Sequence, residues 1–359
     1  MRDYHIAVIP GDGVGEEVTP GGVEVLNAAA ESVGGFRLRH REFPWGCNHY
    51  LSSGRMMPED GLKTLESFDA IYFGAVGFPG VPDHVSLRGL RLPICQRFEQ
   101  YVCLRPSQIL PGIPSPLAGK TAGDVDFVVV RENTEGEYVG AGGRAHEGLP
   151  IEAAVQTTMF SRVGIERVAR YAFDLARSRR HRLVSATKSN AQQHAFTFWD
   201  EVVEEVAADF PDVELERVLI DALAARFVLA PESLDVVVAS NLFGDILTDL
   251  GAAICGSLGV APSGNINPER AYPSMFEPVH GSAPDIVGRG IANPVGMIWC
   301  GAMMLDFLGE TEAASLIHSA VRAVSADGRT RTPDLGGTAT TRDVVDAVLK
   351  QMARPTRPS

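Results

Sequence analysis

The chain has 359 residues, of which 45% are hydrophobic and 21% charged, a composition typical of a globular protein with about two domains. Its formal net charge of −13 and pI near 5.2 argue against binding to nucleic acid or to an anionic membrane, because clustered Lys and Arg hold phosphate groups. We therefore expect a small-molecule partner, with no nucleic acid and no membrane.

The five cysteines, Cys47, Cys95, Cys103, Cys255 and Cys300, are odd in number, are scattered and include no C-x-x-C pair. Such usage is typical of a reducing compartment. The sequence shows no secretory signal at its start and no apolar run long enough to cross a bilayer. These features predict a cytoplasmic protein that is neither exported nor embedded in a membrane.

The first predicted elements are a strand, a glycine-rich turn and a helix in HIAVIPGDGVGEEVTP, residues 5–20. A dinucleotide-binding fingerprint has the spacing G-x-G-x-x-G, whereas Gly11, Gly13 and Gly15 are followed by Glu16 and Glu17. Two carboxylates in the first helical turn suit the helix dipole but do not suit a pyrophosphate in the same place. The turn is therefore predicted to be structural, with any cofactor site elsewhere.

Short apolar runs recur along the chain in FDAIYFGAVG, DFVVVRENTEG, HRLVSATKSN and LDVVVASNLFGD. Runs of this kind are typical of strands buried on both faces. Amphipathic helices lie between them, for example 165–177, in which Ile165, Val168, Ala172 and Leu175 form one apolar face. The alternation predicts an α/β fold with a largely parallel sheet, and the Pro- and Gly-rich segment 106–120 is predicted to cross between domains.

Charged residues follow several predicted strands, at the sheet edge where α/β proteins bind ligands. Arg105 and Arg131 each end an apolar run, and Tyr138 lies seven residues beyond Arg131. Two guanidinium forks can hold a small dicarboxylic acid, although a surface salt bridge is the alternative for each arginine alone. Lys188, after HRLVSAT, is a candidate general base or else an ordinary solvent-exposed lysine.

The segment SNLFGDILTDL places Asp245 and Asp249 four residues apart on a predicted helix, so both carboxylates lie on one face. Like charges at that separation are tolerated when a cation lies between them, and oxygen ligands favour Mg²⁺ or Mn²⁺ over zinc. Asp221, in VLIDALAARF, is a candidate third ligand. The alternative interpretation is a solvated acidic face.

The segment MFEPVHGSAPDIVGRGIANP, residues 275–294, is rich in glycine, proline and small residues. Such a loop lets backbone approach a nucleotide closely, and Asp285 would accept hydrogen bonds from ribose hydroxyls and repel a 2′-phosphate. His280 and Asn293 are the other polar candidates. From composition alone, the segment is an irregular, compact loop.

Several motifs follow one another along the chain, namely IPGDGVG, RENTEGEY, ATKSN, SNLFGDILTDLG and FEPVHGSAPDI with IANP. In their order and spacing they resemble the metal-dependent β-decarboxylating dehydrogenases of the isocitrate/isopropylmalate dehydrogenase family. Within this family, the tartrate/D-malate dehydrogenase branch is the one to which the longest matching segments are similar, namely VVVASNLFGDIL, DAIYFGAVG and GAMMLDFLG. The resemblance covers nearly the whole chain and implies two α/β domains with a large mixed, mostly parallel sheet, which is not a Rossmann fold. The larger, nucleotide-binding domain would comprise 1–104 and 256–359, and the second domain, 105–255, would carry the dimer interface and the metal and substrate site.

The resemblance also implies a homodimer with shared active sites, in which Lys188 and Asp221 come from the partner subunit and Asp245 and Asp249 from the home subunit. The catalytic residues would be Tyr138, Lys188 and Asp221, the substrate-binding residues Arg105 and Arg131, and the Mg²⁺ or Mn²⁺ ligands Asp221, Asp245 and Asp249. K⁺ is a further candidate cofactor. The implied NAD-binding residues are His280, Gly281, Ser282, Ala283, Pro284, Asp285 and Asn293.

One substrate position departs from the family pattern. Ten residues before Arg105, where the family usually has an arginine, this chain has Cys95, and a thiol cannot form a bidentate clamp. Our hypothesis is that Arg91 replaces the missing fork and changes the substrate, with Arg97 as a second candidate. Arg91 and Cys95 therefore join the expected substrate-binding residues, although Pro93 predicts that a helix starts between them.

Together these features predict an NAD-dependent, divalent-metal-dependent enzyme that oxidatively decarboxylates a D-malate-like 2-hydroxy dicarboxylic acid to a 2-keto acid and CO₂. One alternative is the same reaction on a bulkier or more anionic 3-substituted malate. A second alternative, a noncatalytic regulatory paralogue, is disfavoured because Tyr138, Lys188, Asp221, Asp245 and Asp249 are all present.

Overall fold

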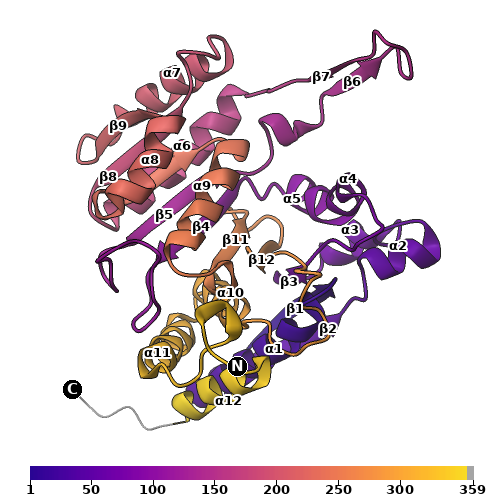
Figure 1. The fold of residues 1–359 in the computed structure, drawn as a ribbon, viewed down its shortest axis with the longest axis vertical. Helices are drawn as coiled ribbons and strands as arrows, with labels where there is room; N and C mark the ends of the chain where they lie inside the picture. Colours follow the sequence, from indigo (N-terminus) through magenta and orange to yellow (C-terminus); the bar gives the residue numbers. More distant parts are fainter. Residues whose placement is uncertain (354–359) are drawn as a thin grey trace. The chain divides into compact units, whose positions relative to one another are not determined.

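The computed structural model describes residues 1–353, which divide into two compact units (Figure 1). Unit 1 comprises Met1–Gln100, Gln108–Val125 and the chain from Ala252 onward, and unit 2 comprises Tyr101–Ser107 and Asp126–Gly251. The division differs from the expected domains at Gln108–Val125, which the sequence places in the second domain. The segment clusters with unit 1 because Leu110 and Ile113 are buried in the core of that unit.

The sheet of unit 1 has five strands in the order β2-β1-β3-β12-β11. β1 pairs in parallel with β2 and with β3, β3 pairs in parallel with β12, and β11 and β12 are antiparallel. Ala70 lies opposite Ser274, so purple and orange strands are neighbours in Figure 1. The bounds are β1 Arg2–Gly11, β2 Phe36–Glu42, β3 Ala70–Ala75, β11 Pro262–Ile266 and β12 Ser274–Pro278.

The sheet of unit 2 has five strands in the order β4-β5-β10-β8-β9, with parallel pairing between β5 and β10, β10 and β8, and β8 and β9. Their bounds are β4 Val102–Gln108, β5 Asp126–Glu132, β8 Arg182–Thr187, β9 Glu214–Leu219 and β10 Val236–Ala239. A separate antiparallel hairpin, β6 Gly142–Ala145 and β7 Ala153–Gln156, is exposed along its length. The predicted α/β class with mixed, mostly parallel strands is confirmed.

Helices connect the strands in both units. Those of unit 1 are α1 Gly15–Val33, α2 Cys47–Ser53, α3 Gly61–Leu65, α4 Asp83–Ser86, α5 Leu92–Arg97, α10 Val295–Leu308, α11 Thr311–Asp327 and α12 Thr341–Met352. The others are α6 Arg162–Arg177, α7 Ala195–Ala207, α8 Ile220–Leu229 and α9 Asn241–Ile254. Within residues 1–353, no helix is both long and apolar enough to span a membrane.

The helix predicted at 165–177 is α6, which begins three residues earlier because Ser161 caps it. The Ser161 hydroxyl accepts a hydrogen bond from the Gly164 N–H at 3.0 Å, which satisfies one of the free donors of the first turn. Ile165, Val168 and Ala172 are fully buried on the predicted apolar face. The periodicity of three to four residues therefore identified the correct face.

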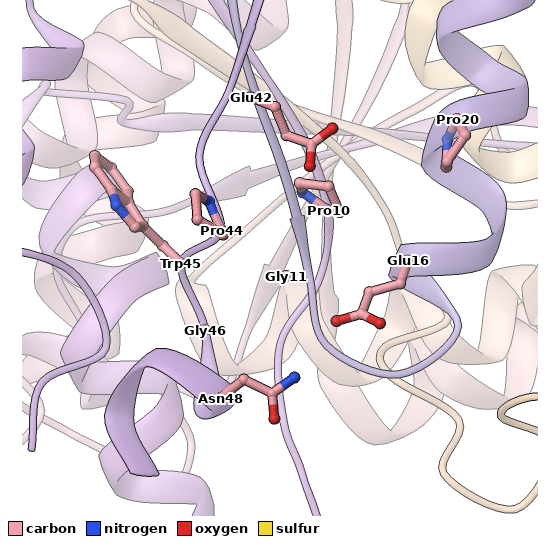
Figure 2. A pocket seen from close by; sticks show the side chains of 9 residues that line it. All are labelled: Pro10, Gly11, Glu16, Pro20, Glu42, Pro44, Trp45, Gly46 and Asn48. Carbon is pink, nitrogen blue, oxygen red and sulfur yellow. The ribbon is translucent and has the colours of Figure 1, made fainter. Parts of the chain in front are cut away.

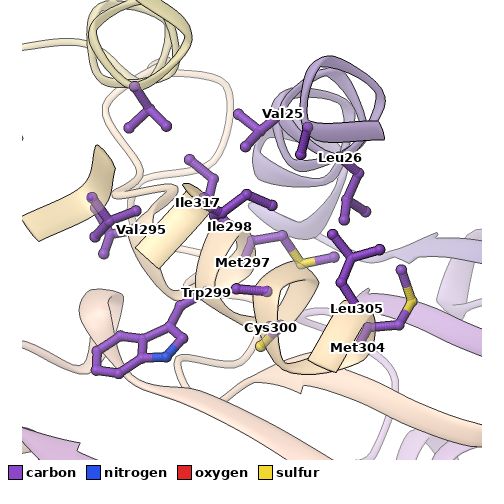
Figure 3. Packing of buried hydrophobic residues seen from close by; sticks show 14 of the residues in the cluster. Val25, Leu26, Val295, Met297, Ile298, Trp299, Cys300, Met304, Leu305 and Ile317 are labelled. Atoms are coloured by element: carbon purple, nitrogen blue, oxygen red, sulfur yellow. The ribbon is translucent and has the colours of Figure 1, made fainter. Parts of the chain in front are cut away.

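The core of unit 1 is built around α10, which is buried over most of its circumference (Figure 3). Met297, Met304 and Leu305 are fully buried and belong to one apolar cluster with Leu26 of α1 and Ile317 of α11. A helix that is apolar on all sides is stable only when other elements cover it. Each such side chain contributes about 1.5–3 kcal/mol by its removal from water, so this cluster fixes the end of the loop that precedes α10.

α5 begins at Leu92, between Arg91 and Cys95 as predicted, with Pro93 in its first turn, but the residues before it are helical as well. α4 is followed directly by a π-helical turn, Leu87–Arg91, and then by α5, so helical backbone runs from Asp83. A proline inside an α-helix removes a hydrogen bond and clashes with the carbonyl four residues earlier. The wider π turn immediately before Pro93 relieves this conflict, and the proline therefore continues the helix.

All five cysteines are free thiols, and all are buried. The structure therefore contains no disulfide bond within residues 1–353. Burial and the neighbouring Asp12 carboxylate raise the pKa of Cys47 to about 12, so this thiol stays protonated at physiological pH.

Candidate functional site

The glycine-rich turn between β1 and α1 is structural, as predicted. Both carboxylate oxygens of Asp12 are used inside unit 1: Oδ1 accepts from the Cys47 N–H at 2.7 Å and Oδ2 from the Gly77 N–H at 2.9 Å. Gly11 has a φ of 73°, and a Cβ there would lie 1.8 Å from the Ala75 carbonyl oxygen. The turn therefore needs glycine for close backbone packing.

A recess of about 290 Å³ lies beside this turn (Figure 2). Its lining includes the carboxylates of Glu16 and Glu42 and the amide of Asn48, and it includes no Lys or Arg from the described residues. A pyrophosphate requires cationic groups or free N–H donors at its site. The recess therefore lacks the chemistry of a dinucleotide phosphate site.

A second cavity in unit 1, of about 450 Å³, lies against the loop between β12 and α10. Four of the predicted nucleotide-binding residues line it, namely His280, Ala283, Asp285 and Asn293. Gly281, Ser282 and Pro284 belong to the same loop, and the Ser282 carbonyl accepts a hydrogen bond from the Val14 N–H at 3.0 Å. The structure thus gathers these predicted residues at one cavity beside the PGDG turn.

His280 presents an unused acceptor at this cavity. Its Nδ1 lies 2.7 Å from the Gly281 carbonyl oxygen and donates to it, which leaves Nε2 as a buried acceptor with no partner within residues 1–353. Burial lowers the pKa of His280, although the Gly281 hydrogen bond and Asp334 oppose this effect. A neutral ring with an orphaned acceptor fits a ligand that brings an N–H or O–H donor, as a nucleoside does.

Asp334 is a cavity residue that the sequence reasoning missed. Its Oδ2 accepts from the Asn293 amide at 3.0 Å and from the Ser257 hydroxyl at 2.5 Å, and its Oδ1 accepts from the Thr332 hydroxyl. These bonds hold Asn293 at the cavity wall. The sequence TPDLGG carries no pattern that marks this aspartate, because its partners are distant in the chain.

In unit 2, two buried arginines meet Asp245 of α9. Arg131 is 2% exposed; its Nε and Nη2 donate to the Asn241 Oδ1 at 3.0 and 2.6 Å, and its Nη1 donates to the Asp245 Oδ1. Arg105 is 7% exposed; its Nη1 donates to the Thr248 hydroxyl at 2.7 Å and lies 3.5 Å from the same Asp245 oxygen. The two predicted substrate arginines are therefore brought together, with Asn241 and Thr248 as partners that the sequence did not indicate.

Tyr138 completes this cluster. Its hydroxyl donates to the Asp245 Oδ2 at 2.9 Å, and the Arg131 guanidinium lies 5.3 Å from the centre of its ring. Tyr138 follows β5 through the loop that contains Glu135, and the Asn241 amide donates to the Glu135 carbonyl at 3.2 Å. The Tyr138 hydroxyl is thus held by the Asp245 carboxylate, which both arginines also approach.

Asp249 lies one helical turn beyond Asp245 and is exposed. Within residues 1–353 its carboxylate makes no hydrogen bond or ion pair. Partial burial raises the pKa of Asp249; Arg105 and Arg131 lower it, and the Asp245 carboxylate raises it. The carboxylates of Asp245 and Asp249 lie one helical turn apart, and the charged form of Asp249 is unfavourable and unpaired among the described residues. Such oxygen donors are typical of a divalent-cation site.

Lys188 and Asp221 form a second pair in unit 2. The Lys188 Nζ lies 2.8 Å from the Asp221 Oδ1, and the two side chains are 25% and 68% exposed. The hydrogen bond from Lys188 is the main reason that the pKa of Asp221 lies below its ordinary value. The structure therefore brings together the proposed base and its proton-transfer partner.

The expected metal ligands do not assemble within the described chain. No group of three or more His, Cys, Asp or Glu side chains in residues 1–353 is placed to hold a metal ion. Asp221 thus does not join Asp245 and Asp249 in a single copy.

Arg91 and Cys95 lie in the interior of unit 1. The Arg91 Nε donates to the Glu277 Oε1 at 2.7 Å, its Nη2 donates to the Asn265 Oδ1 at 3.2 Å, and the side chain is 9% exposed. Cys95 is fully buried in an apolar cluster. Arg97 is exposed and pairs with Glu66 at 2.9 Å. The Arg91 fork is therefore occupied by a buried carboxylate, and its substrate role stays a prediction.

Comparisons with known proteins identify the family of the chain. The family model for isocitrate/isopropylmalate dehydrogenase matches residues 5–348. The chain is 54% identical to a probable tartrate dehydrogenase/decarboxylase of Agrobacterium vitis, over 98% of this chain and 97% of the relative. It is also 54% identical to D-malate dehydrogenase (decarboxylating) of Escherichia coli K12, over 99% of this chain and 100% of the relative.

Among solved structures, isocitrate dehydrogenase from Methylococcus capsulatus superposes with a TM-score of 0.87 at 33% identity, covering 98% of this chain and 100% of that one. The resemblance inferred from the motifs is thereby confirmed. The chain belongs to the isocitrate/isopropylmalate dehydrogenase family and is a decarboxylating dehydrogenase, an oxidoreductase that acts on a CH–OH group.

Proposed function

We propose that this protein catalyses the NAD-dependent, divalent-metal-dependent oxidative decarboxylation of a D-malate-like 2-hydroxy dicarboxylic acid. The observation that carries the proposal is the cluster of Arg105, Arg131 and Tyr138 around Asp245, with the unpaired Asp249 one turn away. Relatives named for tartrate and D-malate support this substrate class.

Arg105 and Arg131 orient the substrate through its carboxylates. Both guanidinium groups are almost completely buried, so an ion pair with them is weakly screened by solvent. Asn241 and Thr248 fix the direction of the two forks. We expect a second carboxylate on the substrate to be essential for tight binding, because two cationic groups converge here.

Asp245 and Asp249 of one subunit, with Asp221 of the partner subunit, would hold Mg²⁺ or Mn²⁺. When bound, the ion supplies Lewis acidity to the oxygens of the substrate. The carboxylates of this chain also set its position, because both belong to α9, a rigid helix that follows β10. A K⁺ requirement is tested by its omission from the assay.

Lys188 and Tyr138 carry the proton transfers. As hydride passes from the 2-carbon to NAD⁺, Lys188 accepts the proton of the 2-hydroxyl, directly or through water and Asp221, its partner at 2.8 Å. The C–C bond to the neighbouring carboxylate then breaks, CO₂ leaves, and Tyr138 returns a proton to carbon. The hydrogen bond at 2.9 Å to Asp245 holds the Tyr138 hydroxyl for this step.

The cavity beside His280 and Asp285 is the proposed NAD site. The unpartnered His280 Nε2 suits a nucleoside donor, and Asp285 suits ribose hydroxyls while disfavouring a 2′-phosphate. NAD should therefore be preferred over NADP. Glutamate or aspartate at this place is a common basis for that preference in nucleotide sites.

We also propose a homodimer with shared active sites. Leu229 of α8 and Ile246 of α9 are 78% and 56% exposed, and Val155 of the β6–β7 hairpin is 66% exposed. Exposed apolar side chains on several elements of one unit favour a protein partner. A second copy would also supply Lys188 and Asp221 to Asp245 and Asp249, which they do not join in one chain.

A substrate panel tests the reaction. The purified protein with NAD⁺, K⁺ and Mn²⁺ should form NADH fastest with D-malate or tartrate, and slower with isopropylmalate and isocitrate. A reversal of this order would support the bulkier-substrate alternative. No NADH with any of these acids would support a noncatalytic paralogue.

Mixing of two inactive variants tests the shared site. Lys188→Ala and Asp249→Ala dimers, unfolded and refolded together, should recover about a quarter of the wild-type activity, because each mixed dimer has one intact site. Each variant refolded alone is the control. If all of these side chains act within one subunit, mixing recovers nothing.

A further inference from the structure

The loop that lines the nucleotide cavity is fastened to α1 by a single carboxylate. The Glu17 Oε1 accepts a hydrogen bond from the Gly288 N–H at 2.6 Å, and the Glu17 Oε2 accepts one from the Gly290 N–H at 3.1 Å. Gly288 and Gly290 have φ values of 76° and 62°, which L side chains rarely adopt. This backbone conformation points both amides at one side chain.

The residue between the two glycines is Arg289, which lines the cavity together with Asp285. Its own N–H donates to the Ile286 carbonyl at 3.2 Å, so the backbone is fixed at three successive amides. Within residues 1–353, neither Arg289 nor Asp285 makes an ion pair or a side-chain hydrogen bond. The cavity therefore carries one free carboxylate and one free guanidinium, which match hydroxyl and phosphate groups respectively.

We propose that Glu17 is a positioning residue for nucleotide binding: its carboxylate fixes the turn 288–290, so that Arg289 is held at the cavity and binds a phosphate of the dinucleotide. The proposal rests on the NAD site described under the proposed function. Glu17 contacts the loop backbone and acts through Arg289.

The adjacent Glu16 provides a matched comparison. Both residues lie in the first turn of α1 and carry the same charge, so they interact alike with the helix dipole. Glu16 lines the other recess, beside Pro10 (Figure 2), and within residues 1–353 its carboxylate accepts no hydrogen bond. Glu16→Gln therefore removes a first-turn charge without touching the loop.

The first measurement uses the protein without nucleotide. In hydrogen–deuterium exchange, amides in residues 286–291 should exchange about tenfold faster in Glu17→Ala than in wild type, because both charged acceptors are lost. Glu17→Gln keeps the shape but offers one acceptor in place of two, so it should fall between them. Glu16→Gln should match wild type; equal exchange in Glu17→Ala and Glu16→Gln would overturn the clamp.

The second measurement separates phosphate from nucleoside by calorimetry with ADP-ribose and adenosine. Arg289→Ala should weaken ADP-ribose about tenfold and adenosine less than twofold, and Arg289→Lys should restore part of the loss. Glu17→Ala should weaken ADP-ribose in the same direction. The double variant should bind ADP-ribose no more weakly than Arg289→Ala does, because both substitutions remove the same interaction between Arg289 and phosphate. Additive losses, or equal losses with adenosine, would contradict the proposal.

Failure of the proposed function gives a different pattern. If wild type binds neither ADP-ribose nor NAD⁺, the cofactor assignment is wrong, and the exchange data alone decide whether Glu17 holds the loop. If wild type binds ADP-ribose and Arg289→Ala binds it equally well, the NAD site stands and the role of Glu17 and Arg289 is overturned.

Discussion

The nucleotide cavity of unit 1 and the arginine–carboxylate cluster of unit 2 use their polar groups differently. In unit 1, the carboxylates of Glu17 and Asp334 accept hydrogen bonds from the cavity loop and the Thr341 hydroxyl donates one to it, so the loop is held within one unit. In unit 2, charged side chains converge, yet the Asp249 carboxylate has no hydrogen-bond or ion-pair partner among residues 1–353, and Asp221 pairs with Lys188 instead. On the proposed function, we therefore expect nucleotide binding to be independent of a second copy and catalysis to depend on it.

The largest expected effect separates these two regions. Lys188→Met should lower kcat about 10³-fold, because a positioned general base contributes on this scale, while NAD⁺ affinity stays within twofold of wild type. Stopped-flow absorbance and calorimetry measure the two quantities. Lys63→Met, an exposed lysine of α3, is the control. An equal loss of NAD⁺ affinity would show that the regions are coupled.

The next effect concerns Arg91, whose substrate role and core role predict different outcomes. Arg91→Met leaves the buried Glu277 unpaired and should lower the free energy of unfolding by about 3–5 kcal/mol, with little change in substrate KM. Urea unfolding and steady-state kinetics measure both. Arg88→Met, an exposed arginine in the same π turn, is the control. A large rise in KM at unchanged stability would instead support Arg91 as the substrate fork.

A third effect is confined to the core of unit 1. Leu305→Ala in α10 should lower the free energy of unfolding by about 3 kcal/mol through lost burial and the cavity left behind. The kcat of the folded enzyme should stay within twofold, since the catalytic cluster belongs to unit 2. Leu51→Ala, at a 61% exposed position, should change neither quantity. A fall in kcat beyond twofold in the folded Leu305→Ala enzyme would mean that packing in the core of unit 1 affects the cluster in unit 2.

The smallest effect is the pH dependence of Asp249. Partial burial holds the pKa of Asp249 in the folded protein above the ordinary value of an aspartate, so its ionisation lowers stability as pH rises through the folded pKa. At pH values where the carboxyl is protonated in both the folded and the unfolded state, it has no such effect. Without divalent metal at pH 7.5, Asp249→Asn should raise Tm by about 1–2 °C. The gain should vanish below the unfolded pKa.

Added Mn²⁺ should make wild type more stable than Asp249→Asn, because a ligand stabilises only the protein that binds it. Wild type should gain Tm while Asp249→Asn should not. Calorimetric scans at several pH values check both statements. A variant that is less stable than wild type at neutral pH without metal would contradict the unfavourable charge assigned to Asp249.

Local patterns in the sequence predicted local structure well. The β1–turn–α1 segment and the buried face of α6 follow from hydrophobic period and glycine placement, which are properties of neighbouring residues. Pro93 correctly indicated a helix start between Arg91 and Cys95, but the π turn before it was not predicted, because such a turn leaves no local signature. Each charged residue at the end of a predicted strand could be identified as a candidate site residue, since parallel strands place their carboxyl ends at one edge of the sheet.

Contacts between distant residues could not be predicted in this way. Arg91 and Glu277 are 186 positions apart, and Glu17 and Gly288 are 271 apart, so no spacing rule links them. The resemblance to a family supplied the partnership of Lys188 with Asp221, which composition alone did not indicate. Asn241 and Thr248 were missed because neutral residues on α9 carry no charge pattern that marks them as arginine partners.

The burial of all five thiols gives each unit an internal reporter of opening. Four of them, Cys47, Cys95, Cys255 and Cys300, belong to unit 1, and Cys103 belongs to unit 2. A thiolate forms only when its surroundings open to water, and alkylating reagents react with the thiolate. The rate at which each cysteine is modified therefore records how often its neighbourhood exposes itself, and mass spectrometry of the labelled peptides would rank the two units by local unfolding.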